Sequence, residues 1–252
     1  MITHQITFSP TGGTRRVSEL LCKTIDANST LTELCVKEEE LNPPSIAADD
    51  LVVISMPVYA GRVPALAVER LKAIKANGAK CAIVAVYGNR AYEDALVEMQ
   101  DVTTDSGFQV IAAVAAIAEH SVCRIYGKGR PDEADAKGLA SFGEAILDKA
   151  KKDKPFEPLA LPGNRPYKQG CTGPYPTAND DCVECGTCAS QCPTGAISAE
   201  NLKGNTTELC IGCMRCVSVC PVQARGIGER LNLLAAHLEP LCKERKRNEL
   251  FL

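Results

Sequence analysis

Eight of the 14 cysteines in this chain stand in two runs of identical spacing, and these runs constrain the fold more than any other feature. In each run, three cysteines follow one another at every third position, and a fourth comes four residues later, directly before a proline. The first run holds Cys182, Cys185, Cys188 and Cys192, and the second holds Cys210, Cys213, Cys216 and Cys220. The second run repeats the first at an offset of 28 residues. Two copies of one short motif predict a small duplicated unit.

The spacing within each run is that of bacterial two-cluster ferredoxins. Each iron of a 4Fe-4S cubane needs one thiolate, and three cysteines in a short turn can reach three neighbouring corners. In this pattern, the cysteine before the proline binds the other cluster. The predicted ligand sets are therefore Cys182, Cys185, Cys188 and Cys220 for one cluster, and Cys210, Cys213, Cys216 and Cys192 for the second.

Two other uses of cysteine fit the runs less well. Structural zinc sites usually join two separated Cys-x-x-Cys pairs, whereas each run here packs three cysteines at one repeated spacing. A disulfide framework needs an oxidising compartment. The segment Met1–Gln5 has neither a positive leader nor an apolar core, so no secretory signal is visible and a cytoplasmic location is expected. Of the cysteines outside the runs, Cys171 lies in the predicted linker near the clusters, and a redox-active thiol there is the weaker interpretation because no paired cysteine or activating neighbour is evident.

Charge and hydropathy limit the partners of the chain. The formal net charge of -3 gives no broad basic field, so nucleic acid binding is not expected. The longest apolar stretch, 110–118, is too short to span a bilayer, so no membrane span is expected. Bound clusters add negative charge to their own domain, which should therefore attract basic redox partners.

The rest of the chain is predicted to form a larger α/β domain. Residues 1–153 alternate short apolar runs with helical patterns, which predicts a doubly wound parallel sheet of five strands. The candidate strands are 5–8, 32–36, 51–55, 81–86 and 109–117. A proline- and glycine-rich linker is predicted over 154–179, and the two-cluster domain over 180–228. Residues 229–252 should form a helix, with Leu231, Leu234, Leu238 and Leu241 along one side, that packs on a domain.

A loop of small residues follows the first predicted strand and precedes a helix. Its members are Ser9, Pro10, Thr11, Gly12, Gly13 and Thr14. Backbone N–H groups in such a loop can approach a phosphate closely, and the helix N-terminus adds a favourable dipole. An ordinary turn with Thr14 as the helix cap is the alternative. Pro10 removes one N–H donor from this loop.

Two further loops follow the third and fourth predicted strands, beside the switch point of such a sheet. The first contains Pro57, Val58, Tyr59, Ala60, Gly61 and Arg62, and the second contains Gly88, Asn89, Arg90, Ala91 and Tyr92. A flat flavin ring needs an apolar or aromatic face and backbone contacts to its polar edge. Tyr59 is the stacking candidate, Asn89 can bond the polar edge, and Arg62 or Arg90 can stabilise the reduced ring. Any one loop alone could be plain connecting structure.

Taken together, these motifs resemble the flavodoxin-ferredoxin fusion proteins, over nearly the whole chain. The resemblance implies a flavodoxin-like sheet of order 2-1-3-4-5 that binds FMN, followed by a small α+β domain with two 4Fe-4S clusters. It places phosphate contacts at Ser9, Thr11, Gly12, Gly13 and Thr14, and flavin contacts in the 57–62 and 88–92 loops. It also suggests a contact at His120, which could instead cap its strand or bond the 127–131 loop.

The expected function is electron transfer between the two clusters and FMN, with other redox proteins as donors or acceptors. A flavin exchanges either one or two electrons and so can join paired to single electrons. An FMN-dependent reductase of a small molecule is the second possibility, which an open cavity over the flavin would favour. A redox sensor or docking module is the third. The carrier is favoured because no substrate-specific acid, base or anion clamp stands out.

Overall fold

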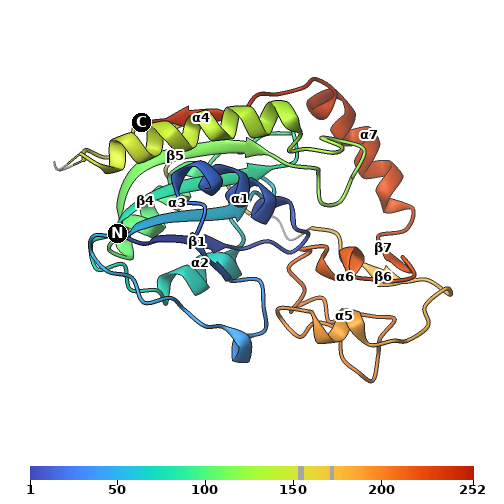
Figure 1. The fold of residues 1–252 in the computed structure, drawn as a ribbon. Coiled ribbons are helices and arrows are strands. Elements are labelled where there is room, and N and C mark those ends of the chain that lie inside the picture. The colour runs from blue at the N-terminus through green and yellow to red at the C-terminus, as the bar shows by residue number, and fades with distance from the viewer. Residues whose placement is uncertain (153–155, 171–172) are drawn as a thin grey trace.

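The computed structural model describes residues 1–152, 156–170 and 173–252, so Cys171 lies outside the described residues. A sheet of six strands with helices on both faces forms the larger part, and a small cysteine-rich region lies beyond the carboxyl ends of its parallel strands (Figure 1). The sheet strands are β1 (Thr3–Thr7), β2 (Thr30–Glu33), β3 (Leu51–Pro57), β4 (Lys80–Tyr87), β5 (Gln109–Ile117) and β8 (Glu249–Phe251). Their order is β2-β1-β3-β4-β5-β8.

The first five strands pair in parallel, which gives the flavodoxin-like order 2-1-3-4-5 that the sequence predicts. Strands β1, β3, β4 and β5 are buried along nearly their whole length. Parallel sheets covered on both faces need such continuous apolar runs. Strand β2 ends at Glu33, earlier than the predicted 32–36 segment, because the Glu33 carboxylate accepts the backbone N–H groups of Ser9 and Cys35 at 2.9 and 2.8 Å.

Helices cover both faces of the sheet. Helices α1 (Gly13–Ile25) and α4 (Glu133–Ala150) pack on one face, where Val17, Leu21 and Leu139 join the core. Helices α2 (Ala65–Lys72) and α3 (Ala95–Asp105) pack on the other. A single turn of 3-10 helix, η1 (Glu38–Glu40), lies in the β2–β3 connection. The two apolar clusters fix the strand ends that carry the predicted cofactor loops.

The sheet has a sixth strand, which the sequence pattern does not predict. Strand β8, at the end of the chain, pairs antiparallel with β5 through Ala113–Phe251, Val114–Leu250 and Ala115–Glu249. The expectation of a helix alone over 229–252 was therefore incomplete. A strand of three residues has too little sequence for a period of two to be visible.

The small region holds short elements joined by the cysteine loops. Helices α5 (Thr187–Ser190) and α6 (Arg215–Ser218) each contain a cysteine of one run. Strands β6 (Thr177–Ala178) and β7 (Arg225–Gly226) form a two-stranded antiparallel sheet beside them. The region lies beyond the carboxyl ends of the parallel strands (Figure 1).

Helix α7 (Arg230–Cys242) leads from this region back to the larger sheet. Leu238 is buried, whereas Leu231 and Leu241, which were predicted on the same packed side, are 41% and 45% exposed. The helix therefore packs through a narrower stripe than the leucine pattern predicts. In the part of the chain that the structure describes, no helix is long and apolar enough to cross a membrane.

Candidate functional site

The three predicted flavin loops lie together at one edge of the sheet. Parallel strands end on the same side, and the loops after β1, β3 and β4 therefore converge there with the segment after β5. The small cysteine region touches this edge directly. Arg215 and Ser218 of α6 donate hydrogen bonds to the carbonyl oxygen of Pro10 in the first loop, at 3.2 and 3.4 Å.

The loop of residues 9–14 leaves four backbone donors free. Gly12 has a left-handed backbone with φ of 87°, and helix α1 begins at the next residue. The Ser9 hydroxyl accepts the N–H of Arg15 at 2.9 Å, so Ser9 supplies a side-chain acceptor to the first turn, and Thr14 is not the cap that the alternative interpretation required. The N–H groups of Thr11, Gly12, Gly13 and Thr14 have no acceptor among the residues that the structure describes. Free donors at a helix start are what a phosphate binds.

Gly13 also allows this loop to approach strand β5. A Cβ atom added at Gly13 would lie 3.0 Å from the Cβ atom of Ala118. A small hollow beside it is lined by Thr11, Gly13 and Thr14 together with residues of the loops after β3 and β4. The phosphate loop and the two flavin loops are therefore continuous around one space.

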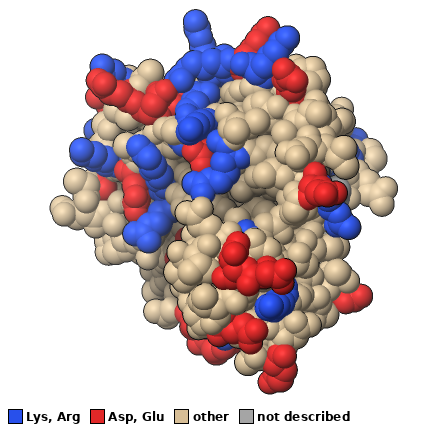
Figure 2. Space-filling view, turned by 90° about the vertical axis from the view of Figure 1, so that its right-hand side faces the viewer, with Lys and Arg blue, Asp and Glu red and all other residues tan. Residues whose placement is uncertain are grey.

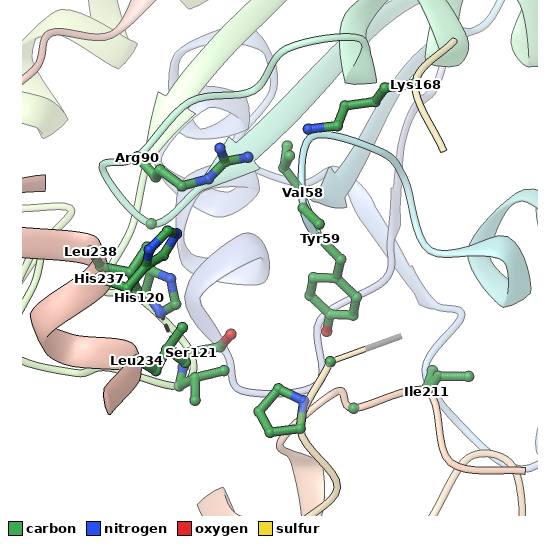
Figure 3. A pocket seen from close by; sticks show the side chains of 16 residues that line it. Val58, Tyr59, Arg90, His120, Ser121, Lys168, Ile211, Leu234, His237 and Leu238 are labelled. Atoms are coloured by element: carbon green, nitrogen blue, oxygen red, sulfur yellow. Dashed lines mark hydrogen bonds between the residues drawn. The ribbon is translucent and has the colours of Figure 1, made fainter. Parts of the chain in front are cut away.

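The 57–62 loop makes a tight turn that presents Tyr59. Tyr59 and Arg62 exchange backbone hydrogen bonds of 2.8 and 3.1 Å, with Ala60 and Gly61 in left-handed conformations between them. A side chain at Gly61 would collide with Glu93. The Tyr59 side chain extends from this turn toward the cysteine region (Figure 3).

The Tyr59 hydroxyl lies near two thiols. Burial, reinforced by the charges of Cys213 and Cys35, raises the pKa of Tyr59 well above its ordinary value. The hydroxyl therefore stays protonated. Cys213 belongs to the second cysteine run, so Tyr59 borders both the flavin loops and the second predicted cluster site.

Arg62 has a structural role that sequence reasoning did not foresee. Its guanidinium binds the Glu98 carboxylate through two hydrogen bonds of 2.7 Å, and donates to the backbone oxygen of Lys168 at 2.6 Å. It also stacks over the ring of Tyr167 at 4.7 Å from the centroid. Arg62 thereby fixes the linker against the sheet. Its positive charge is already paired with the Glu98 carboxylate, so it does not serve as the predicted partner of a reduced flavin.

The side chain of Asn89 is also committed elsewhere. Its amide nitrogen donates to the carbonyl oxygens of Cys242 and Glu244 at 2.6 and 2.8 Å. Its amide oxygen accepts the N–H of Lys246 at 3.2 Å. Asn89 therefore holds the C-terminal segment, and only its backbone groups can serve as the predicted flavin contact.

Arg90 and Tyr92, the two large side chains left in the 88–92 loop, have different surroundings. Arg90 borders the cavity described below and pairs with Glu93 at 2.9 Å. Tyr92 points toward the sheet, where its ring packs edge-on against Tyr87 and its hydroxyl donates to Glu249 of β8 at 3.2 Å. Arg90 thus remains a candidate flavin neighbour, while Tyr92 helps to hold the last strand.

His120 follows β5 and faces the same cavity. Its Nδ1 atom accepts the backbone N–H groups of Val122 and Cys123 at 3.2 and 3.1 Å. Burial and then the charge of Arg90 lower the pKa of His120. A neutral ring with Nδ1 as acceptor carries its proton on Nε2. His120 is thus a neutral hydrogen-bond donor that also orders its own loop.

These loops enclose a cavity of about 370 Å³ between the sheet and the cysteine region. Figure 3 shows Val58, Tyr59, Arg90, His120 and Ser121 around it, with Lys168 above. The remaining wall comes from segments outside the larger sheet: the linker at Gly173 and Pro174, the second cysteine run at Ile211 and Gly212, and helix α7 at Leu234, His237 and Leu238. Sequence reasoning missed this second wall, because its members come from chain far from the strand-end loops. The pair Leu234 and Leu238, one helical turn apart, was the available signal for it.

The eight cysteines of the two runs line two further cavities. One is lined by Cys182, Cys185, Cys188 and Cys220, and the other by Cys192, Cys210, Cys213 and Cys216. Cys185 is exposed, whereas Cys213 and Cys216 are buried. The first cavity therefore lies nearer to solvent, and the second lies against the larger sheet.

A second arginine ties the cysteine region to the sheet. Arg70 of α2 is buried, and its guanidinium donates to the carbonyl oxygens of Leu34, Val36 and Pro193. Pro193 directly follows Cys192 of the second cavity. With the contacts from α6 to Pro10, this bond holds the second cavity in place beside the flavin loops.

Comparison with known proteins agrees with this division. Residues 181–225 match the model of the 4Fe-4S dicluster domain family. The comparison with curated proteins gives no significant match. The cysteine region is thereby similar to 4Fe-4S dicluster domains, and we refer to it below as the dicluster domain.

Solved structures similar to the larger part include flavodoxins. A flavodoxin from the domain Archaea shares 14% identity, with a TM-score of 0.43, over 60% of this chain and 100% of its own. The flavodoxin of Streptococcus pneumonia TIGR4 shares 15%, with a TM-score of 0.42, over 59% and 99%. The rubredoxin oxygen:oxidoreductase of the anaerobe Desulfovibrio gigas shares 14%, with a TM-score of 0.42, over 59% and 36%. The flavodoxin-like fold itself rests on the strand order. The chain joins that fold to a dicluster domain, a combination that indicates electron transfer.

Proposed function

We propose that this protein is an electron carrier that passes electrons between a redox-protein partner and FMN through two 4Fe-4S clusters. The observation that carries the proposal is that the 370 Å³ cavity and the second cysteine cavity are neighbours: Ile211 lines both, and Tyr59, which lines the larger one, interacts with Cys213. A cluster bound at Cys213 would be the nearest metal centre to a flavin in that cavity.

The residues around the larger cavity fit FMN. Its volume falls within the range of small-molecule pockets, about 300–1,000 Å³. Tyr59, Val58 and Gly88 offer apolar and backbone surface to the ring, and they also line the adjoining small hollow, where the free N–H groups of Gly13 and Thr14 suit the phosphate. When bound, FMN supplies the exchange between single and paired electrons.

The two cysteine cavities fit cubane clusters. Four cysteines line each cavity, and each set takes three members from one run and the fourth from the other. We assign one cluster to Cys182, Cys185, Cys188 and Cys220 and the second to Cys210, Cys213, Cys216 and Cys192. Soft thiolate ligands select iron-sulfur clusters over hard cations.

The surface suggests where a protein partner docks. Acidic side chains gather over the dicluster domain in the lower part of Figure 2, with few basic ones among them. The exposed acidic residues there are Asp180, Asp181, Glu184, Glu200 and Glu208. Glu184 directly precedes Cys185, the exposed cysteine of the first run. A basic redox protein would therefore reach the first cluster, and the second cluster would connect it to FMN.

The proposal is tested on protein purified without oxygen. Heat-released FMN, the ultraviolet-visible spectrum and the iron content should show one flavin and two cubanes per chain. An anaerobic redox titration followed by optical and electron paramagnetic resonance signals would then order the three centres. Two clusters without stoichiometric flavin would refute the carrier mechanism.

A reductase of a small molecule is the second candidate. The exposed His237 at the large cavity gives it one entrance from solvent, and Arg90 and Lys168 bring positive charge. Both cations, however, bond to the same carboxylate of Glu93, at 2.9 and 2.6 Å. This pairing weakens their attraction for an anionic substrate. Reoxidation of the reduced protein by small anions, at rates above that of a flavin-free control, would favour the reductase.

A further inference from the structure

Two arginines line the cysteine cavities, and each has a buried Nε–H group that donates to no acceptor among the described residues. Among the described residues, three buried side-chain nitrogen or oxygen atoms lack a hydrogen-bond partner: Ser55 Oγ, Arg215 Nε and Arg225 Nε. Arg225 lines the cavity of Cys182, Cys185, Cys188 and Cys220, and Arg215 lines the other. Buried donors are rarely left unpaired in folded proteins, so each Nε points to a missing acceptor.

The charge of Arg225 is also uncompensated. Arg225 is 4% exposed, and its terminal nitrogens donate to the carbonyl oxygens of Leu202, Pro176 and Gly204 at 2.5, 3.1 and 2.9 Å. One of them lies 3.5 Å from the Cys188 sulfur. No carboxylate pairs with it in the described part of the chain. A buried cation without an anion is costly, so a negative group is expected beside it.

Arg215 is built in a similar way at the second cavity. Its terminal nitrogens donate to the Pro10 carbonyl and to the side-chain oxygen of Gln191, at 3.2 and 2.8 Å, and both acceptors are neutral. None of the carboxylates of the described residues pairs with it. Arg215 thereby spans from the second cavity to the loop of residues 9–14.

The internal repeat shows that the two arginines complement each other. At the offset of 28 residues, Arg225 corresponds to Ile197 and Arg215 corresponds to Thr187. Ile197 lines the cavity of Arg215, and Thr187 lines the cavity of Arg225. Each cavity is therefore lined by one arginine, from a different position of the repeat, and by an uncharged residue at the other position. The Arg225 guanidinium lies between the two cavities, because it also bonds Cys216 and acts on Cys210 of the second one.

We propose that Arg225 and Arg215 are positioning residues that each donate an Nε–H hydrogen bond to the sulfur of one 4Fe-4S cluster and supply its internal counter-charge. The inference rests on the proposed function, because it requires both clusters to be bound. A positive group and an N–H donor both favour the more negative, reduced cluster, so each arginine raises the reduction potential of its own cluster. Arg225 lines the cavity of the cluster nearer to solvent and also faces Cys216 of the other cluster, whereas Arg215 lines the cavity nearer to the flavin loops.

The test exchanges each arginine for its repeat counterpart in the full-length protein. Arg225→Ile and Arg215→Thr are compared with Arg247→Ile, which removes the same charge from an exposed position. Iron content establishes that both clusters are bound, and a mediated titration with dithionite, followed by electron paramagnetic resonance, gives both reduction steps. We expect Arg225→Ile to lower chiefly the reduction potential of the cluster nearer to solvent, and Arg215→Thr to lower that of the other cluster. Each shift should be at least about tenfold in the equilibrium constant, or about 59 mV.

If a variant loses a cluster, Arg225→Lys or Arg215→Lys takes its place. Lysine keeps the positive charge but lacks the Nε donor, so the reduction potential of the same cluster should still fall. Pulsed electron paramagnetic resonance on reduced protein with ¹⁵N-labelled arginine should show a coupling between the cluster spin and an arginine nitrogen. The variant that carries both Arg225→Ile and Arg215→Thr should lack this coupling. Two bound clusters whose steps move no more than in Arg247→Ile would overturn the inference alone. Native protein without clusters would overturn the proposed function as well.

Discussion

Replacement of Asn89 by glycine should release the C-terminal segment from the flavin loops. Asn89 has a left-handed backbone with φ of 63°, which glycine adopts without strain, so the change removes the amide and leaves the turn intact. Four bonds are lost, and three of them hold the C-terminal segment: those to the carbonyl oxygens of Cys242 and Glu244 and from the N–H of Lys246, at 2.6, 2.8 and 3.2 Å. The fourth, from the Arg130 guanidinium at 3.5 Å, is the longest.

The expected cost is about 3 kcal/mol, at a net value of about 1 kcal/mol for each hydrogen bond. Water can reach the released groups once the segment opens, so the larger penalty for permanently buried unpaired groups does not apply. At about 1.4 kcal/mol for each factor of ten, the opening equilibrium of the segment should rise by roughly two powers of ten.

Hydrogen exchange measured by mass spectrometry on peptides covering 243–251 checks this prediction. Asn77→Gly is the matched control, because Asn77 also has a left-handed backbone, with φ of 51°, and makes one side-chain bond, to Ile46, at the opposite end of β4. Unchanged exchange in Asn89→Gly, or equal acceleration in both variants, would refute the reasoning.

Three further changes test other parts of the site. Gly88→Ala should place a Cβ atom 2.6 Å from the His120 ring, destabilise the fold by about 1–3 kcal/mol and reduce the FMN recovered on heating, whereas Gly138→Ala, in open space, should not. Because burial lowers the pKa of His120, its contribution to stability is present above the unfolded pKa of about 6.5 and is lost as pH falls through the folded pKa. His120→Asn should therefore flatten the acid side of a plot of the thermal midpoint against pH, and an unchanged slope would contradict this. Cys192→Ala should remove the cluster of Cys210, Cys213 and Cys216 and halve the iron content, whereas loss of the other cluster would show that ligation is not crossed.

The positions of the cofactor loops could be predicted because they follow from local sequence. A buried apolar run followed by glycine marks the end of a strand, and parallel topology brings such ends to one edge. Cysteine spacing likewise predicted which residues line each small cavity, because the pattern itself specifies the exchange of Cys192 and Cys220 between the runs.

The roles of single polar side chains could not be predicted in the same way. Asn89 bonds Cys242, 153 residues later in the chain, and Arg62 bonds Glu98 on another element. An amide or guanidinium after a strand has the same chemistry whether it faces a ligand or a distant backbone. Which of these it does depends on tertiary packing, and no short pattern reports that.

Strand β8 changes the status of the dicluster domain from an appendage to an insertion. The chain leaves the flavodoxin-like sheet after α4, forms the dicluster domain, and returns through α7 to pair with β5. A segment fixed at both ends keeps a high effective concentration beside its partner even when one connection is cut. Cleavage within 156–170 should therefore leave the dicluster domain docked on the flavodoxin-like sheet. Electron transfer inside the chain should likewise not depend on the length of that linker.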